Sequence, residues 1–201
     1  SNKFYVENTG IEFLNRFLEI DIFALFFVCL CFLFIINGSN LIDGYNGLLS
    51  IHTLIILINL FFVNYFNENN DLAFFILCII LIITVFLKYN FPKATIFLGD
   101  GGAYFLGAFT AISVIKTSIA NPTISPFYFC ILLFYLFFEV FFSFIRKIAG
   151  EKISPLLPDK KHLHMLIYKS FLKKNKNTLK SNYYVSIVIN LIYLILIIPA
   201  I

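Results

Sequence analysis

Long uncharged apolar stretches alternate with short polar connections along most of this chain. Residues 22–36 and 48–66 carry no charged side chain, and further apolar stretches follow them. A helix needs about 20 such residues to cross the hydrocarbon core of a bilayer. The pattern therefore predicts six membrane spans, near 21–37, 48–66, 71–88, 103–120, 126–146 and 183–201. The expected fold class is all-α, a polytopic transmembrane helix bundle.

Composition favours a membrane protein over a soluble helical domain. Hydrophobic residues make up 60% of the 201 residues and charged residues only 13%, against roughly 45–50% apolar residues in soluble domains. A soluble core of this length cannot hide 27 phenylalanines. The four cysteines form no CxxC pair and lie inside apolar stretches, which indicates small packing residues rather than a disulfide framework or a metal site; they are Cys29, Cys31, Cys78 and Cys130.

The first 21 residues mix charged and apolar side chains. Ile11, Leu14, Phe17 and Leu18 recur at helical spacing, which predicts a short amphipathic helix on the membrane surface. We expect residues 1–201 to form a single integral membrane domain. The start Ser1-Asn2-Lys3, without an initiator Met or a signal-peptide n-region, indicates the middle of a longer protein.

Basic residues lie mostly on one side of the predicted membrane topology. With six alternating spans, connections 38–47, 89–102 and 147–182 share a side, and 147–182 is a strongly basic loop. Lys and Arg accumulate on the cytoplasmic side of membrane proteins, so this side is predicted to be cytoplasmic. It carries 12 of the 15 basic residues, namely Lys88, Lys93, Arg146, Lys147, Lys152, Lys160, Lys161, Lys169, Lys173, Lys174, Lys176 and Lys180.

A polar, glycine-containing stretch, residues 37–48, separates the first two apolar spans. Asn37, Asn40 and Asp43 are spaced i, i+3, i+6 and therefore share one face as the span ends. Gly44 and Gly47 allow the backbone to turn and to approach a ligand closely. Carboxamides and a carboxylate at the end of a membrane helix are costly. A helix C-cap is the alternative explanation, but a cap needs one such residue.

A second polar stretch, residues 97–107, places Asp100 among Gly99, Gly101 and Gly102 just before a span. Amide groups at a helix N-terminus favour phosphate, and a carboxylate there can hold Mg²⁺ against phosphate oxygens. The alternative is an N-cap aspartate with glycines for close helix packing. A dinucleotide-binding loop is not indicated, because no strand precedes the glycines.

A third polar stretch, residues 155–165, contains His162 and His164. Two histidines at i, i+2 face one side of an extended segment, and with the neighbouring lysines they favour phosphate binding over a zinc site. A solvated basic loop is the alternative. Glu139 is the only acidic residue inside the later spans, so it is either structural or it orients this loop. His52 lies inside a span and is assigned to bundle packing.

These three stretches, in this order and on one side, resemble the motifs of the polyprenyl-phosphate N-acetylhexosamine-1-phosphate transferases, glycosyltransferase family 4. The family pattern NxxNxxDGxDGL is matched by Asn37, Asn40, Asp43, Gly44, Gly47 and Leu48. FxGDxGS is matched by Phe97, Gly99, Asp100 and Gly101-Gly102, and PDRxHxHH by residues 158–165. The resemblance spans roughly residues 20–168 and is close to the undecaprenyl-phosphate GlcNAc-1-phosphate transferases.

Several positions depart from the family patterns. Asn46 replaces the second Asp of the first motif, and Gly102 stands where Ser is usual. In the third motif Lys160 replaces Arg and Met165 replaces the last His, which leaves the sugar preference open. The aspartate-rich DDxxD motif that precedes these motifs in relatives is absent from this sequence. Full-length members of the family have about ten or eleven spans, so the resemblance implies that this chain is the C-terminal part of a longer enzyme.

The resemblance implies transfer of a sugar-1-phosphate from a UDP-N-acetylhexosamine to polyprenyl phosphate, with release of UMP and with Mg²⁺ or Mn²⁺ as cofactor. It implies Asp43, Asp100, His162 and His164 as catalytic residues, with Asp100 and Asp43 on the metal. The substrate-binding residues it implies are Asn37, Asn40, Gly44, Tyr45, Asn46, Phe97, Gly99, Gly101 and Lys160.

The same resemblance implies a multi-pass protein of the bacterial inner membrane with a cytoplasmic active face, acting in cell-wall or lipopolysaccharide synthesis. The expected partners are the UDP-sugar, the polyprenyl phosphate and the lipid bilayer, with no nucleic acid and with homodimer formation left open. Two alternatives remain. One is a catalytically incomplete fragment or paralogue. The other is a non-enzymatic transporter, which should place polar groups at mid-membrane in several spans.

Overall fold

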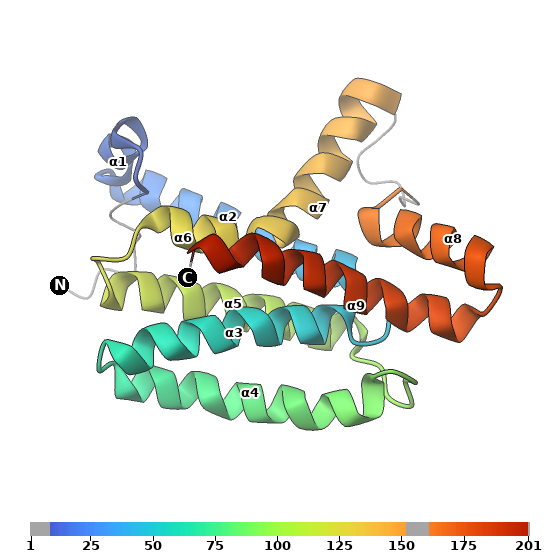
Figure 1. The fold of residues 1–201 in the computed structure, drawn as a ribbon. Helices are drawn as coiled ribbons and strands as arrows, with labels where there is room; N and C mark the ends of the chain where they lie inside the picture. The colour runs from blue at the N-terminus through green and yellow to red at the C-terminus, as the bar shows by residue number, and fades with distance from the viewer. Residues whose placement is uncertain (1–8, 152–160, 201) are drawn as a thin grey trace.

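The computed structural model describes residues 9–151 and 161–200, and it is a helical bundle (Figure 1). No strand occurs among these residues. The α-helices are α1 (Glu12–Leu18), α2 (Asp21–Ile42), α3 (Leu48–Phe66), α4 (Asn70–Asn90), α5 (Gly99–Ala120), α6 (Pro126–Leu132), α7 (Phe134–Ile145), α8 (Leu163–Asn175) and α9 (Thr178–Ile197). A π-helical turn, Arg146–Glu151, extends α7, and a 3₁₀ turn, Ile198–Ala200, follows α9.

The predicted polytopic membrane bundle is confirmed. Helices α2, α3, α4, α5 and α9 are each long and apolar enough to cross a bilayer. The predicted span 126–146 is a bent pair, α6 and α7, whose axes differ by 68°. Figure 1 shows α7 projecting away from the other helices beyond this bend. The short helix α1 lies where the amphipathic surface helix was predicted.

Several predicted span limits were too short, and three of them affect the candidate site. Helix α9 begins at Thr178 rather than at residue 183, so Asn182 lies within it. Helix α2 continues to Ile42, past the predicted end at residue 37, so the first polar stretch forms its last turns. Helix α5 begins at Gly99 rather than at residue 103, so Asp100 lies in its first turn instead of preceding it. The prediction ended each span at its first polar side chains, but a helix can continue with such residues into the membrane interface.

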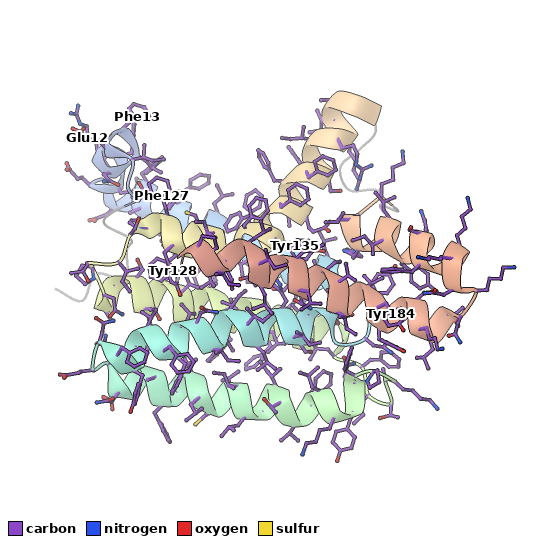
Figure 2. All side chains as sticks on the ribbon, viewed as in Figure 1. Glu12, Phe13, Phe127, Tyr128, Tyr135 and Tyr184 are labelled. Carbon is purple, nitrogen blue, oxygen red and sulfur yellow. The ribbon has the colours of Figure 1, made fainter. Side chains whose placement is uncertain are left out.

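Large apolar side chains cover the outside of the bundle (Figure 2). Phe74, Leu81 and Ile195 are each more than half exposed, at 69%, 58% and 66%. In water this much exposed apolar surface would be unstable. In a bilayer these side chains contact lipid, which agrees with the assignment of the long helices as membrane spans.

Glycines allow α2 to pack closely against two other helices. A Cβ atom at Gly38 would lie 2.5 Å from the carbonyl oxygen of Leu136 in α7. A Cβ at Gly107 in α5 would lie 2.9 Å from the Cα of Ile36. Small residues at such crossings let membrane helices approach backbone to backbone. These contacts fix the position of α2, whose last turns carry the first polar stretch.

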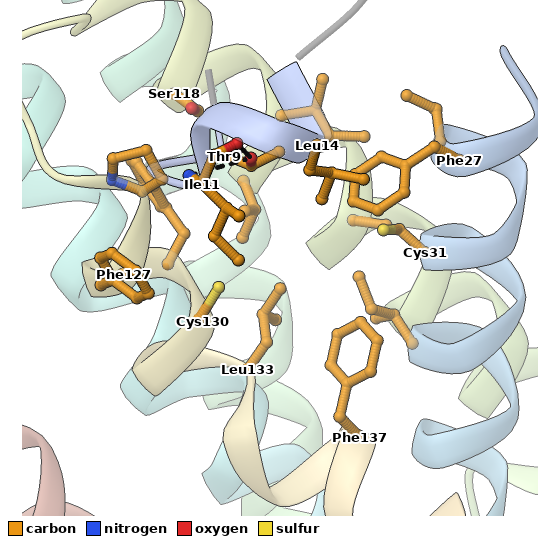
Figure 3. Close-up of a pocket in the computed structure, with 17 residues that line it drawn as sticks. Thr9, Ile11, Leu14, Phe27, Cys31, Ser118, Phe127, Cys130, Leu133 and Phe137 are labelled. Atoms are coloured by element: carbon orange, nitrogen blue, oxygen red, sulfur yellow. Dashed lines mark hydrogen bonds between the residues drawn. The ribbon is translucent and has the colours of Figure 1, made fainter. Parts of the chain in front are cut away.

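An apolar cavity of about 220 Å³ lies where α2 begins and α5 ends (Figure 3). Its lining includes Ile11, Phe27, Cys31, Phe127 and Cys130. None of the candidate site residues lines it. The candidate chemistry is therefore at the other end of α2 and α5.

We expect Gly38→Ala to destabilise the bundle, because the added methyl group meets backbone atoms of α7 that cannot move without shifting the helix. Overpacking of this kind costs about 1–3 kcal/mol. The free energy of unfolding of the purified protein in detergent, measured by denaturant titration, checks this. Gly101→Ala is the matched control, because a Cβ at Gly101 meets nothing within 4 Å. Equal stabilities of the two variants would contradict the packing described for α2 and α7.

Candidate active site

The described parts of the three polar stretches meet at one end of the bundle, which we call the motif end and define by residues 40–47, 90–100 and 161–182. The Asn40 amide donates to Oδ1 of Asp100 at 3.2 Å, which joins the end of α2 to the start of α5. The Asn46 amide donates to the carbonyl of Pro92 at 3.0 Å. The backbone N–H of Asn46 donates to Oδ1 of Asn182, in α9, at 2.8 Å. The opposite end is tied by Asn64, which donates to Thr117 at 2.8 Å.

Asp43 and Asp100 form a pair of neighbouring carboxylates at the motif end. Asp43 caps the C-terminus of α2 and is half-buried, whereas Asp100 is exposed. Burial, and to a smaller extent the nearby negative charge of Asp100, together raise the pKa of Asp43 to about 6. Two like charges held together at a partly dry site attract a cation.

The donor set of this pair fits Mg²⁺. Magnesium is usually held by one or two carboxylates together with substrate phosphates, and it retains several waters. Among the described residues, no group of three or more His, Cys, Asp or Glu side chains could hold a metal by itself. Asp43 and Asp100 therefore suit a metal that arrives with a phosphorylated ligand, and they do not form a closed structural site.

Four other predicted residues lie around this pair without joining its hydrogen bonds. Asn37 is exposed, and its amide donates to the carbonyl of Leu33 at 2.6 Å, within α2. Phe97 precedes α5 and is 74% exposed, so its ring is available for stacking. Gly99 has a φ of +69°, which favours glycine, and Gly101 faces open space.

Amides from α4 and α9 hold the turn that follows Asp43. The backbone N–H of Gly47 donates to Oδ1 of Asn90 at 2.7 Å, and Gly47 adopts a φ of +74° that only glycine adopts readily. The hydroxyl of Ser186 donates to the carbonyl of Asn46 at 2.7 Å. The amide of Asn190 donates to the carbonyl of Leu48 at 3.3 Å. The turn at residues 43–47 is thus fixed from two sides.

Sequence reasoning missed these supporting residues. Asn182, Ser186 and Asn190 are spaced by four and so lie on one face of α9. Polar residues at this spacing inside an apolar span indicate a face that contacts other polar groups, and this pattern is visible in the sequence. Asn46, a predicted substrate residue, uses both its side chain and its backbone N–H within this network. His52 packs in the bundle as predicted, fully buried, with Nδ1 3.2 Å from Oδ1 of Asn190.

Glu139 of α7 binds the histidines of the third stretch. Its Oε2 lies 2.9 Å from Nδ1 of His162, and its Oε1 lies 3.3 Å from Nδ1 of His164. The hydroxyl of Tyr135 donates to Oε1 at 3.0 Å. His162 is extended, and the two imidazoles stack in parallel with an interplanar angle of 3°. The two histidines therefore share a side, as predicted, and Glu139 holds them there.

The third stretch contacts the first through His164. The ring of Tyr45 lies edge-on to the ring of His164, with centroids 5.7 Å apart. A Cβ built on Gly44 would lie 4.0 Å from Nε2 of His164. The predicted residue Lys160 lies outside the described residues. The first and second stretches therefore meet through Asn40 and Asp100, and the first and third through Tyr45 and His164.

We expect the negative charge of Asp43 to destabilise the fold as pH rises. Because the folded-state pKa of about 6 is above the ordinary value of 3.8, the folded state binds more protons between these pH values. The contribution of this group to stability is therefore lost between pH 3.8 and about 6. In EDTA, the unfolding temperature of Asp43→Asn relative to that of the unmodified protein should therefore be higher at pH 8 than at pH 4. Thermal unfolding of both proteins at the two pH values measures this. A stability difference independent of pH would contradict this.

Comparison with known proteins agrees with the motif resemblance. The profile of Glycosyl transferase family 4 matches residues 2–118. The chain is 32% identical over 152 residues to the undecaprenyl-phosphate alpha-N-acetylglucosaminyl 1-phosphate transferase of Thermotoga maritima, covering 73% of this chain and 45% of that protein. It is 31% identical over 111 residues to the phospho-N-acetylmuramoyl-pentapeptide-transferase of Caldicellulosiruptor bescii, covering 55% and 34%.

A further relative is the phospho-N-acetylmuramoyl-pentapeptide-transferase of Streptococcus pyogenes, 34% identical over 110 residues, covering 53% of this chain and 33% of that protein. The chain thus spans less than half the length of the relatives it matches. The family profile covers more than half of this chain, and the bundle is a multi-pass membrane protein with the motif residues at one end. The chain belongs to glycosyl transferase family 4, the polyprenyl-phosphate N-acetylhexosamine-1-phosphate transferases.

Proposed function

We propose that this chain forms the donor-binding part of an enzyme that transfers a sugar-1-phosphate from a UDP-N-acetylhexosamine to polyprenyl phosphate, with release of UMP. The observation that carries the proposal is the meeting of the two carboxylates and the two imidazoles at one end of a membrane bundle. A soluble donor and a membrane-bound acceptor can react only where the bilayer meets water. The motif end would supply that position.

The proposed chemistry needs charge neutralisation and alignment more than covalent machinery. Asp100 and Asp43 would hold Mg²⁺ or Mn²⁺, which when bound neutralises charge on the donor diphosphate. Asn40 orients the Asp100 carboxylate through its 3.2 Å hydrogen bond. The attacking oxygen belongs to the acceptor phosphate, and the bond that breaks joins the sugar-bearing phosphorus to the bridging oxygen of UMP.

The remaining motif residues would bind the donor. The exposed ring of Phe97 would stack on uracil, and the turn of Gly44, Tyr45 and Asn46 would line the nucleotide site next to it. His162, His164 and Lys160 would contact phosphate or sugar. Asn37, Gly99 and Gly101 would lie at the edge of the site, where the open space beside the glycines leaves room for a ligand.

An apolar cavity beside the histidines supports a lipid acceptor. It has a volume of about 170 Å³ and lies between α7, α8 and α9. Tyr135, whose hydroxyl binds Glu139, and Leu163, which lies between the two histidines in sequence, both line it. Ile192 and Leu196 of α9 line it on the other side. An isoprenoid chain in this cavity would place its phosphate near the motif end.

The distribution of basic residues supports an orientation with the motif end in the cytoplasm of a bacterial cell, in the inner membrane. Anionic donors and acceptors would also be attracted there. The relatives support a role in building cell-envelope glycans. A transporter is less well supported, because the buried polar residues His52 and Asn190 contact each other.

Asp100→Asn in the intact enzyme should abolish Mg²⁺-dependent release of UMP, because it removes a charge that would hold the metal on the diphosphate. Asp71→Asn is the matched control, since Asp71 is also an exposed acidic residue in the first turn of a membrane helix, α4. The control should retain turnover within about 3-fold. Turnover near the unmodified rate in Asp100→Asn would remove Asp100 from the proposed site.

A donor panel identifies the sugar. The intact protein is incubated with polyprenyl phosphate and, in turn, UDP-GlcNAc, UDP-GalNAc, a UDP-bacillosamine-type sugar and UDP-MurNAc-pentapeptide. We expect UMP release with a UDP-N-acetylhexosamine. UMP release with none of the four donors would favour the incomplete-paralogue alternative.

Ile192→Trp should weaken the use of polyprenyl phosphate, because the larger side chain fills part of the cavity between α7, α8 and α9. We expect the KM for polyprenyl phosphate to rise at least about 5-fold, in line with the roughly 1–3 kcal/mol that overpacking costs, with little change in the KM for the UDP-sugar. Ile195→Trp is the control, since Ile195 lies on α9 outside the cavity lining. Equal effects of the two tryptophans would rule out this cavity as the acceptor site.

A further inference from the structure

Glu139 is a buried carboxylate whose place in the membrane bundle the motifs do not explain. It lies in α7 and is 2% exposed. A carboxylate in such a position is costly unless its oxygens are satisfied. The 68° bend between α6 and α7 directs α7 toward the third stretch, so that Glu139 faces residues 162–164. The cost of burying it is offset there by specific partners.

The partners of Glu139 determine where the protons of the histidines lie. An ionised carboxylate only accepts hydrogen bonds. The 2.9 Å hydrogen bond between Oε2 and Nδ1 of His162 requires a proton on that nitrogen. Nδ1 of His164 makes no hydrogen bond but lies 3.3 Å from Oε1, where the negative charge of the carboxylate favours a proton on it. The Tyr135 hydroxyl occupies another lone pair of Oε1. Two hydrogen bonds and the nearby Nδ1 of His164 therefore surround both oxygens of this carboxylate.

The other ring nitrogen of His164 is left for a ligand. The side chain of His164 is fully buried, and neither ring nitrogen makes a hydrogen bond with the described residues. Nδ1 lies 3.3 Å from Oε1 of Glu139, and Nε2 is on the other side of the ring. A buried polar atom without a partner costs about 1–3 kcal/mol. Nε2 lies next to Gly44, where the absence of a side chain leaves space. This nitrogen is therefore directed at the turn that follows Asp43.

We propose that Glu139 is a positioning residue: it fixes the Nδ1–H form of His162 and His164 and holds Nε2 of His164 toward the turn at Gly44. There Nε2 would contact an oxygen of the donor's phosphate or sugar. The identity of that ligand rests on the proposed function, whereas the fixed ring orientation does not. A carboxylate that orients an imidazole through Nδ1 leaves Nε2 as the functional atom.

The ring orientation is tested by NMR on ¹⁵N-histidine-labelled intact protein at pH 9, with His162→Asn and His164→Asn used to assign the signals. We expect Nδ1–H signals for both histidines. Glu139→Gln should convert at least one of them to the Nε2–H form, because a single amide oxygen cannot replace two carboxylate oxygens. Tyr135→Phe is the matched control: it removes a bond to the same carboxylate and should leave both Nδ1–H signals. Nε2–H signals for both histidines in the unmodified protein would overturn the proposal.

Activity gives a second readout. Removing a supporting carboxylate of this kind typically costs 10–100-fold in activity, so Glu139→Gln should lower kcat by about 10–100-fold. Glu139→Asp, which keeps the charge, should recover part of the loss. Loss of activity in Glu139→Gln with unchanged histidine signals would overturn the positioning role. If the unmodified protein shows both Nδ1–H signals but releases no UMP with any donor, Glu139 still positions the histidines, and the proposed function is refuted.

Discussion

Backbone groups at the end of an apolar helix bundle need hydrogen-bond partners, and the side-chain amides of α4 and α9 supply them for the turn at residues 43–47. Asn182 accepts from the N–H of Asn46 and Asn90 from the N–H of Gly47, while Asn190 donates to the carbonyl of Leu48 just after the turn. An unpaired buried backbone group costs about as much as a lost hydrogen bond. These hydrogen bonds hold the turn that follows Asp43 in place between α4 and α9.

The other parts of the candidate site depend on this turn. Helix α2 reaches it through close packing at Gly38 and Gly107, which sets where Asn40 and Asp43 emerge. Helix α5 begins beside it and presents Asp100 to Asn40. Helix α7 bends out of the bundle and binds the third stretch through Glu139, so that His164 faces the turn from the opposite side. Helices from three distant parts of the sequence thus meet around one short loop.

Much of this arrangement could be predicted from the sequence. The apolar stretches gave the spans, and the basic residues placed three connections on one side. The polar residues within those connections identified the motifs. That Glu139 orients the third stretch was one of two alternatives for this residue, and the structure shows the contact. These features follow from local composition and helical spacing.

Other features could not be predicted in this way. The bend between Leu132 and Phe134 occurs in a stretch without Gly or Pro, so nothing local marks it. The support of the turn by Asn182 and Asn90 joins residues that are far apart in sequence, and its geometry depends on packing. Asn37 has the same spacing as Asn40, yet its amide bonds within its own helix. Which of two similar side chains joins a site is decided by tertiary contacts.

The central claim is that Asp43 and Asp100 together bind the metal of a nucleotide diphosphate at the motif end. It is tested most directly by a structure of the intact protein with UDP and Mn²⁺, in which anomalous scattering locates the metal. Our account predicts a metal in contact with both carboxylates and with the diphosphate. A metal and nucleotide bound away from Asp43 and Asp100 would contradict it.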